Sequence, residues 1–227
     1  MMQKFEIDGV VLEIPDALLN PRLAEKMAAG KYEANEARAA RMRVKKDHRV
    51  LELGGGVGYI SSICAQITDP ANIVTVEANP NTLNVIRNNL DLNGASAAKM
   101  IHAAVVSNTQ DSETAAFRVG NVFWGSSIAQ TDSATDKIVE VPTIGLFDLF
   151  ENHRPHVVIM DIEGAEEHLF DQKWPRFIRQ VILEIHPTLY GNSTIKTIVD
   201  CMSKSGMTYD PGCSRGAFLG FRRVFEK

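Results

Sequence analysis

One stretch of the chain decides its fold: Glu52-Leu53-Gly54-Gly55-Gly56-Val57-Gly58. It overlaps the end of a short apolar run, 49–53, that is typical of a buried strand, and it leads into a segment, 58–67, with the composition of a helix. Because glycine has no side chain, the backbone amides of such a turn and the helix N-terminus can approach a ligand closely. The stretch therefore predicts a strand, a tight turn and a helix that together bind a cofactor.

The residues around the turn distinguish between two cofactors. A dinucleotide-binding turn has a small residue three positions after its second glycine, but Tyr59 stands there in this chain. Two positions before the turn, Glu52 offers a carboxylate that suits the cationic methionine end of S-adenosylmethionine (SAM) and would repel a pyrophosphate. The next strand, 73–77, ends in Glu77, whose carboxylate can accept hydrogen bonds from both ribose hydroxyls. We therefore expect SAM rather than NAD.

Short β-branched runs alternate with helical segments along the rest of the chain. The predicted strands are 49–53, 73–77, 100–106, 156–161 and 180–185, with weaker runs near 207 and over 217–225. The predicted crossover helices are 58–67 and 80–92, the second begun by Asn79-Pro80 and ended by Asn93-Gly94. This alternation predicts an α/β fold with a doubly wound, mostly parallel sheet.

The N-terminal part has a different pattern. Residues 5–14 alternate around Asp8-Gly9, which predicts a small hairpin, and 17–30 and 33–43 have the composition of two helices. We expect a single domain over residues 1–227, made of a hairpin and helical cap (1–46) and a Rossmann-like core (47–227).

A polar stretch, 107–140, interrupts the alternation and predicts an insertion or lid near the ligand. It contains Phe123, Trp124, Gly125 and Ser126. An aromatic pair in a polar loop usually has an apolar partner, so these residues are expected either to line an acceptor pocket or to pack in the core.

Composition narrows the class of protein. The chain has 227 residues, of which 44% are hydrophobic and 23% are charged, as in ordinary globular domains. Its net charge of −4 does not favour binding to nucleic acid. The three cysteines are widely spaced and no apolar run is long enough to span a membrane, so we expect a cytoplasmic protein with reduced thiols.

Four segments share a pattern with one known family. They are the glycine turn with Tyr59, then Glu77-Ala78-Asn79-Pro80 followed by Asn88 to Asn93-Gly94, then Ala103-Ala104-Val105, and finally Asp161-Ile162-Glu163-Gly164-Ala165-Glu166. Through them the region from about Tyr32 to Glu184 resembles the FkbM family of SAM-dependent methyltransferases, many of which methylate oxygen. The resemblance implies the Rossmann-like fold of class I methyltransferases and places His102 and Ala103 beside adenine. Glu52 and Gly54-Gly55-Gly56 stand where family members often have Asp and Gly-Ala-Asn.

Together, the turn and the resemblance give one set of expected cofactor contacts. These residues are Glu52, Gly54, Gly56, Gly58, Tyr59, Glu77, Ala78, His102, Ala103 and Asp161.

The candidate catalytic residues stand at the ends of two predicted strands. Alternate side chains of a strand share a face, so Asp161 and Glu163 point the same way, as do Glu184 and His186. The carboxyl ends of neighbouring parallel strands meet at one edge of a sheet, where ligands bind in such folds. We therefore expect these four residues to converge beside the SAM methyl group.

Methyl transfer to a hydroxyl needs alignment of the acceptor oxygen and removal of its proton. The base is expected to be either His186, whose ordinary pKa is about 6.5, or one of the carboxylates Asp161 and Glu163. Carboxylates with a histidine also bind divalent ions, but we expect no metal here. The predicted function is a SAM-dependent methyltransferase that O-methylates a small molecule or glycan. A nicotinamide oxidoreductase and a non-catalytic SAM-binding protein are the alternatives, and the oligomeric state cannot be predicted.

Overall fold

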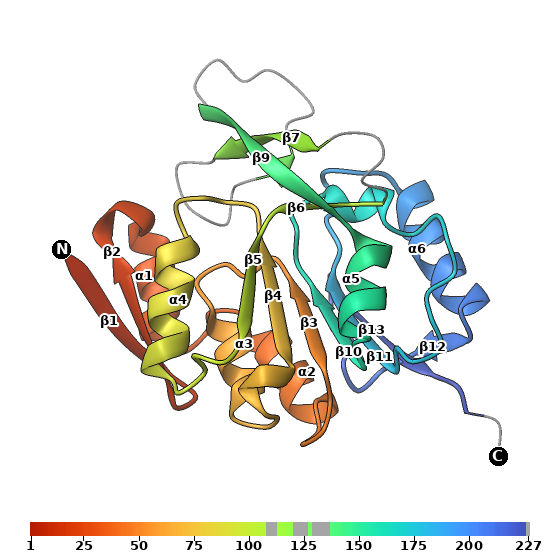
Figure 1. The fold of residues 1–227 in the computed structure, drawn as a ribbon, viewed down its shortest axis with the longest axis horizontal. Helices are drawn as coiled ribbons and strands as arrows, with labels where there is room; N and C mark the ends of the chain where they lie inside the picture. The colour runs from red at the N-terminus through yellow and green to blue at the C-terminus, as the bar shows by residue number, and fades with distance from the viewer. Residues whose placement is uncertain (108–112, 120–126, 129–136, 226–227) are drawn as a thin grey trace.

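The computed structural model describes residues 1–107, 113–119, 127–128 and 137–225. Its main sheet has the strand order β12-β13-β11-β10-β3-β4-β5 (Figure 1). The strands are β3 (Val50–Leu53), β4 (Ile73–Glu77), β5 (Lys99–His102), β10 (Val157–Met160), β11 (Gln180–Glu184), β12 (Met207–Tyr209) and β13 (Phe218–Arg223). Six of these seven strands run in one direction, and β13 runs opposite to them between β12 and β11. The expected doubly wound, mostly parallel α/β sheet is confirmed.

Helices cover both faces of the main sheet. One face packs against α2 (Ala34–Arg43), α3 (Tyr59–Ala65) and α4 (Leu83–Leu92), and the other packs against α5 (Leu146–His153) and α6 (Asn192–Lys204). Strand β3 shows the alternation, because Val50 lies in the first core and Leu51 in the second. A strand buried on both faces needs a continuous apolar run, which is why these strands were recognisable in the sequence. Helices α5 and α6 were not predicted.

The N-terminal cap begins with the expected hairpin. Strands β1 (Met2–Ile7) and β2 (Val10–Pro15) pair around Asp8 and Gly9, both of which have positive φ. A type I′ turn requires that conformation and matches the twist of the strands. The side chains of Asn89 in α4 and of Asn93 just after it accept hydrogen bonds from the backbone of β2, which fixes the hairpin to the core.

The predicted helix 17–30 is wrong in its boundaries. The structure has a short 3₁₀ turn, Asp16–Leu18, and a separate helix α1 (Pro21–Ala28). Pro21 occupies the first helical position, and the side chain of Asn20 accepts a hydrogen bond from the amide of Leu23 at 2.8 Å. The capping side chain of Asn20 and the proline at the first helical position start a separate helix here, so the 3₁₀ turn and α1 do not form one continuous helix.

The predicted strand 100–106 is also wrong as a single strand. It breaks at Ala103: β5 ends at His102 in the main sheet, and β6 (Ala104–Val106) pairs with β9 (Lys137–Gly145) in a second sheet. That sheet, in the order β6-β9-β7-β8, also contains β7 (Thr114–Val119) and β8 (Ser127–Ile128). Figure 1 shows it lying across the top edge of the main sheet. Much of the polar stretch 107–140 therefore forms an insertion, as expected, while residues 123–126 lie outside the described part.

The path of the chain places a crevice at the end of β3. From β3 the chain continues to β4 and β5 on one side, and it later returns to β10 on the other side of β3. Ligands in doubly wound sheets bind where the strand order reverses, outside the carboxyl ends of the strands. Gly54 follows β3 and Asp161 follows β10, so both stand at this crevice.

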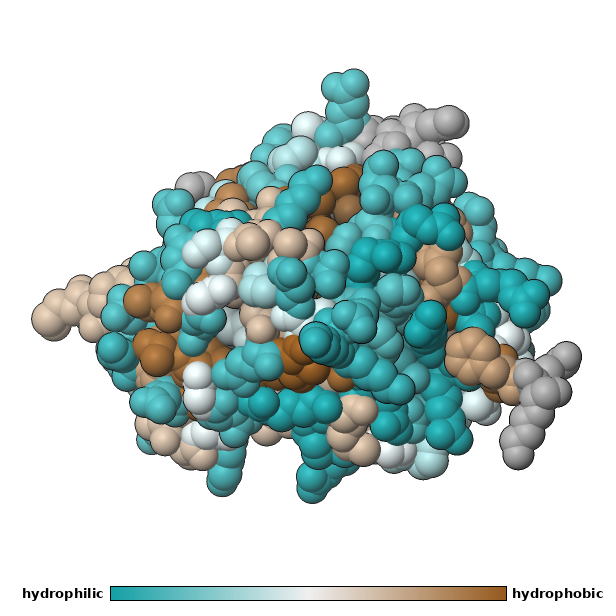
Figure 2. Space-filling model, turned by 60° about the horizontal axis from the view of Figure 1, so that its bottom comes forward, coloured by the Kyte–Doolittle hydropathy of each residue, from teal (hydrophilic) through white to brown (hydrophobic). Residues whose placement is uncertain are grey.

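Two surface properties complete the description. The face shown in Figure 2 is mostly hydrophilic, with hydrophobic residues scattered in small groups. No helix among the described residues combines the length and the apolar character that crossing a membrane requires.

Candidate active site

A cavity opens between the carboxyl edge of the main sheet and the second sheet, and we call it the turn cavity. It is lined by Glu33, Gly54, Gly56, Val76, Glu77, Ala78, Ala103, Ala104, Val105, Phe117, Asp161, Ile162, Glu163 and Ala165. The lining includes six of the residues expected to bind cofactor: Gly54, Gly56, Glu77, Ala78, Ala103 and Asp161. Strand β7 contributes Phe117, so the insertion does reach the cavity, as the sequence predicted.

The glycine turn is held so close to its neighbours that side chains do not fit. A Cβ atom added at Gly54 would lie 1.8 Å from the backbone oxygen of Asp161, and one at Gly55 would lie 2.7 Å from Oγ1 of Thr75. Gly54 also has a φ of +90°, which residues with side chains rarely adopt. The turn therefore presents bare backbone to the cavity, as a cofactor cradle requires.

Glu77 joins the turn to the second strand. Its Oε2 accepts a hydrogen bond from the amide of Gly56 at 2.8 Å, and its Oε1 accepts one from the amide of Asn79 at 2.7 Å. The residue is buried, and burial raises its pKa although these backbone donors act to lower it. Glu77 therefore shapes the turn and also lines the turn cavity.

Two of the expected cofactor residues support the turn from behind. Glu52 points to the α3 side of the sheet, where the hydroxyl of Ser61 donates a hydrogen bond to its carboxylate, and burial raises its pKa to about 7. Gly58 is the residue before α3, and a Cβ atom there would meet the backbone of Ile86 at 3.3 Å. Neither residue lines the turn cavity. Gly58 lets α3 and α4 approach each other.

Two more expected residues also lie outside the lining of the cavity. The phenol of Tyr59 donates a hydrogen bond to Asp8 at 3.2 Å, and its ring lies 5.6 Å from that of Tyr32. His102 ends β5, with Nε2 3.2 Å from the carbonyl oxygen of Ala78. Tyr59 therefore attaches the hairpin to the core, and His102 steadies the segment after Glu77.

A second cavity of about 480 Å³ adjoins the first, and we call it the acidic cavity. Its lining comes from α1, α2, the segment between them, the ends of β10 and β11, and the start of β13: Arg22, Leu23, Lys26, Lys31, Tyr32, Glu33, Ala34, Asn35, Glu36, Asp161, Glu163, Glu184, His186 and Phe218. Its size is in the range of small-molecule sites, roughly 300–1,000 Å³. Glu33, Asp161 and Glu163 line both cavities, so three carboxylates stand at the boundary.

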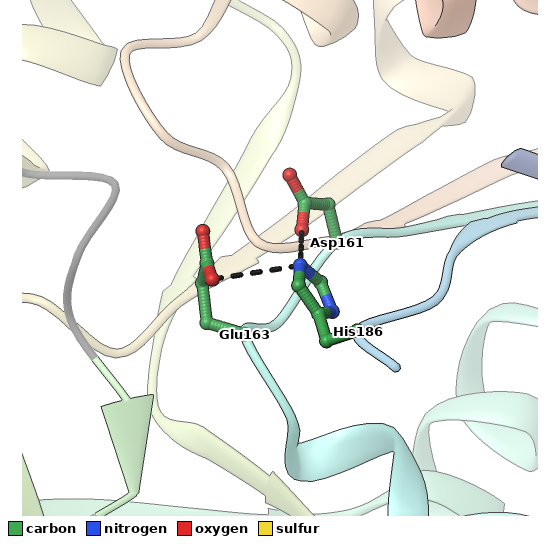
Figure 3. A group of neighbouring side chains, drawn as sticks. All are labelled: Asp161, Glu163 and His186. Carbon is green, nitrogen blue, oxygen red and sulfur yellow. Dashed lines mark ion pairs between the residues drawn. The ribbon is translucent and has the colours of Figure 1, made fainter. Parts of the chain in front are cut away.

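The structure brings the four predicted catalytic residues together. Nε2 of His186 lies 3.5 Å from an oxygen of Asp161 and 3.5 Å from an oxygen of Glu163, as Figure 3 shows. Asp161 also forms a compact group with Glu184 and Glu36, in which one oxygen from each lies within 4.8 Å of the others. Asp161 is thus the centre of the group.

A buried carboxylate fixes the imidazole from its other side. Nδ1 of His186 lies 3.2 Å from Oε1 of Glu166, a residue with no solvent exposure. Burial acts to lower the pKa of His186, but the carboxylates of Glu166, Asp161 and Glu163 outweigh it and raise this pKa to about 9. A raised pKa favours the protonated imidazole, which can donate hydrogen bonds to the carboxylates around it.

Several carboxylates of the group have raised pKa values because they are buried close to one another. Burial raises the pKa of Glu163 to about 7 and that of Glu36 to about 7. Burial, followed by repulsion from Glu184, raises the pKa of Asp161 well above its usual range. Strongly perturbed titratable groups gathered in a cleft are typical of functional sites.

The family model for the methyltransferase FkbM domain matches residues 52–209. The chain belongs to the FkbM methyltransferase family. It is therefore a SAM-dependent methyltransferase, and the family implies SAM as the cofactor. This assignment replaces the nicotinamide oxidoreductase alternative. No curated protein matches the chain.

Three solved structures are similar to this chain at low identity. Precorrin-6y C5,15-methyltransferase from Geobacter metallireducens is 14% identical with a TM-score of 0.48, covering 94% of each chain. M. jannaschii TYW2 in complex with AdoMet is 12% identical with a TM-score of 0.49, covering 98% of this chain and 87% of that one. Ribosomal protein L11 methylase from Lactobacillus delbrueckii subsp. bulgaricus is 11% identical with a TM-score of 0.45, covering 86% and 80%.

Three residues of the site were absent from the sequence-based set of candidates: Glu33, Glu36 and Glu166. The sequence offered one usable signal, because Glu36 lies in a run of alanines of which Ala37, Ala39 and Ala40 are buried. A charged residue is rarely buried on a helix face unless it is paired, so its presence there indicates a partner or a function. Glu33 has a φ of +41°, an uncommon conformation for a residue with a side chain, and nothing in its sequence neighbourhood predicts it.

Proposed function

We propose that this FkbM methyltransferase transfers the methyl group of SAM to a hydroxyl of a small molecule or glycan held in the acidic cavity. One observation carries the proposal: Asp161 and Glu163 line the turn cavity and the acidic cavity at once. An acceptor at this boundary would lie beside the cofactor and against carboxylates. Transfer requires that geometry, because the reacting atoms must be aligned before the bond forms.

The residues that line the turn cavity fit SAM. Gly54 and Gly56 would present backbone to the cofactor, Glu77 would accept hydrogen bonds from the ribose, and Ala78 and Ala103 leave room for the adenine. Bound SAM supplies an activated methyl group. The protein contributes the alignment of the acceptor and a route for its proton.

We further propose that a boundary carboxylate accepts the proton of the acceptor hydroxyl. Glu33, Asp161 and Glu163 line both cavities, whereas His186 lines only the acidic cavity. A general base must lie within hydrogen-bond reach of the proton that it removes. Glu184 and His186, behind the boundary, would hold the carboxylates and the acceptor in place.

Two broader proposals accompany this one. The cap and the core work as a single domain, supported by the shared core in which Leu12 and Met27 of the cap pack with Ile63. The enzyme works in a reducing compartment, the cytoplasm, supported by its three cysteines, which are all buried and unpaired. A net charge of −4 supports a small-molecule acceptor over nucleic acid.

A screen with methyl-labelled SAM tests the function. Sugars, phenols and aliphatic alcohols are offered alongside primary amines and thiols, and the labelled product is identified by mass spectrometry. We expect label on hydroxylated acceptors. Transfer only to amines or thiols would contradict O-methylation. SAM binding by calorimetry with no transfer to any class would favour the non-catalytic alternative.

A further inference from the structure

The acidic cavity holds a group of four carboxylates, and although Arg22, Lys26 and Lys31 also line it, none of these three forms an ion pair with them among the described residues. The carboxylates of Glu36, Asp161, Glu163 and Glu184 gather there, and we call these four the acidic cluster. Within the part of the chain that the structure describes, no lysine or arginine forms an ion pair with any of them, and only the single imidazole of His186 does so. Like charges this close repel strongly in a poorly solvated site. A cation bound among these carboxylates would relieve this repulsion.

One buried atom of the cluster lacks a hydrogen-bond partner, which is an independent sign of a ligand. Oδ1 of Asp161 is fully buried and accepts no hydrogen bond, and its ion-pair partner, Nε2 of His186, lies 3.5 Å away. Buried polar atoms are nearly always satisfied by protein, water or an ion. Asp161 lines both cavities, so a ligand in either one can reach it.

The spacing of the ligand atoms suits a divalent ion. One atom each from Asp161, Glu163 and His186 lies within 4.8 Å of the other two. In octahedral coordination at about 2.1 Å, adjacent ligand atoms are roughly 3 Å apart and opposite ones about 4.2 Å. The distances of 3.5 Å from Nε2 of His186 to the two carboxylates fall between these values. Small rotations of the side chains would complete the geometry.

The surroundings of His186 match those of a metal-binding histidine. Such a histidine usually gives its second ring N–H to a carboxylate, which fixes the ring and leaves the other nitrogen free to bind the metal. The buried Glu166 lies in the position of that carboxylate, 3.2 Å from Nδ1, and Nε2 faces Asp161 and Glu163. Figure 3 shows the two carboxylates converging on this one nitrogen.

We infer that Asp161, Glu163 and His186 bind one divalent cation, with Glu36 and Glu184 beside it and Glu166 positioning the histidine. The mixed carboxylate and imidazole set suits Mn²⁺, which accepts both kinds of ligand. The inference that an ion binds depends only on these contacts, and the role of the ion in catalysis rests on the proposed function. A cation at this place would hold the acceptor hydroxyl and make its proton more acidic. The inference replaces our expectation that no metal binds here.

Titration of the full-length protein with Mn²⁺, followed by the electron paramagnetic resonance signal of the free ion, tests the site without any methyl transfer. We expect one tightly bound Mn²⁺ per chain. Glu163→Gln and His186→Ala should each weaken binding by about 10-fold to 100-fold or more, and Glu166→Gln by about 10-fold. Glu151→Gln, an exposed position on α5, is the matched control and should bind like wild type.

Three results decide against the site. Binding that is equal in Glu163→Gln and Glu151→Gln would show that Mn²⁺ attaches elsewhere on the surface, and an absence of bound Mn²⁺ would have the same force. If added SAM displaces the ion, the carboxylates hold the cationic end of the cofactor instead. Melting temperatures accompany every variant, and a loss of binding relative to wild type counts only in variants that melt at the wild-type temperature. Calorimetry with SAM alone separates a failed metal site from a failed methyltransferase.

Discussion

Gly54 lies directly against the backbone carbonyl of Asp161: a Cβ atom at Gly54 would come within 1.8 Å of that oxygen. The two residues directly follow the neighbouring strands β3 and β10, and the amide of Asp161 donates a hydrogen bond to the carbonyl of Leu53 at 2.9 Å. The cofactor turn and the acidic cluster are therefore parts of one rigid junction. A change in one must displace the other.

Gly54→Ala tests this junction. The added methyl group meets backbone that cannot rotate away, and the φ of +90° is itself unfavourable for alanine, so we expect a loss of at least about 1–3 kcal/mol in the free energy of unfolding. SAM affinity should fall as well. Chemical denaturation and calorimetry measure the two effects. Gly94→Ala is the control, since its φ is +69° but no atom lies within 4 Å, and a cost equal to that of Gly54→Ala would contradict the steric account.

Glu77→Ala should weaken SAM binding and also destabilise the fold. The sequence alone predicted only the first effect. The structure adds the second, because the amides of Gly56 and Asn79 would lose their acceptor. We expect a loss of about 1–3 kcal/mol in each quantity. Glu77→Gln keeps one carbonyl acceptor and should lose less, whereas an unchanged melting temperature for Glu77→Ala would show that water replaces the carboxylate.

The sequence predicted the convergence at the strand ends for a simple reason. Asp161, Glu163, Glu184 and His186 follow two buried apolar runs, and parallel strands with such runs end at one edge of the sheet. Local pattern was sufficient there. It was also sufficient for the turn at Gly54, whose requirements are set by backbone geometry.

Tertiary contacts explain what the sequence did not show. Glu52 shares the face of β3 with Val50, so it points to α3 instead of the cavity, and the alternation of the strand already implied that direction. Glu36 and Glu166 reach the site only through the packing of α2 and of the segment after β10. The break at Ala103 depends on the pairing of β6 with β9, a contact between distant segments that no local pattern encodes.

His186→Ala should separate catalysis from cofactor binding. His186 lines the acidic cavity but not the turn cavity, so SAM affinity should stay within a few fold of wild type. Turnover of an acceptor found in the screen should fall by about 10²-fold or more, because the boundary carboxylates that accept the proton lose the side chain that positions them. Steady-state kinetics and calorimetry measure the two. Near-normal turnover would make the imidazole a purely structural residue.

Glu52 should make the stability of the protein depend on pH. Burial raises its pKa to about 7 in the folded protein, against about 4.3 in an unfolded chain. Between these values the folded state keeps a proton that the unfolded state has lost. The contribution to stability is therefore fully present below about pH 4, falls as the pH rises to 7, and changes little above that. Its size is of the order of 3 kcal/mol.

Glu52→Gln isolates this effect, because glutamine is neutral at every pH and keeps an acceptor for the hydroxyl of Ser61. The difference in unfolding free energy between wild type and Glu52→Gln, measured by denaturation from pH 4 to 8, removes the contributions of all other titrating groups. We expect the unfolding free energy of the variant, relative to that of wild type, to rise steadily from pH 4 to 7. At pH 8 the variant should be the more stable protein. A difference that does not change with pH would mean that Glu52 is ionised in the folded protein, and that the hydroxyl of Ser61 and nearby backbone stabilise its charge well enough to offset burial.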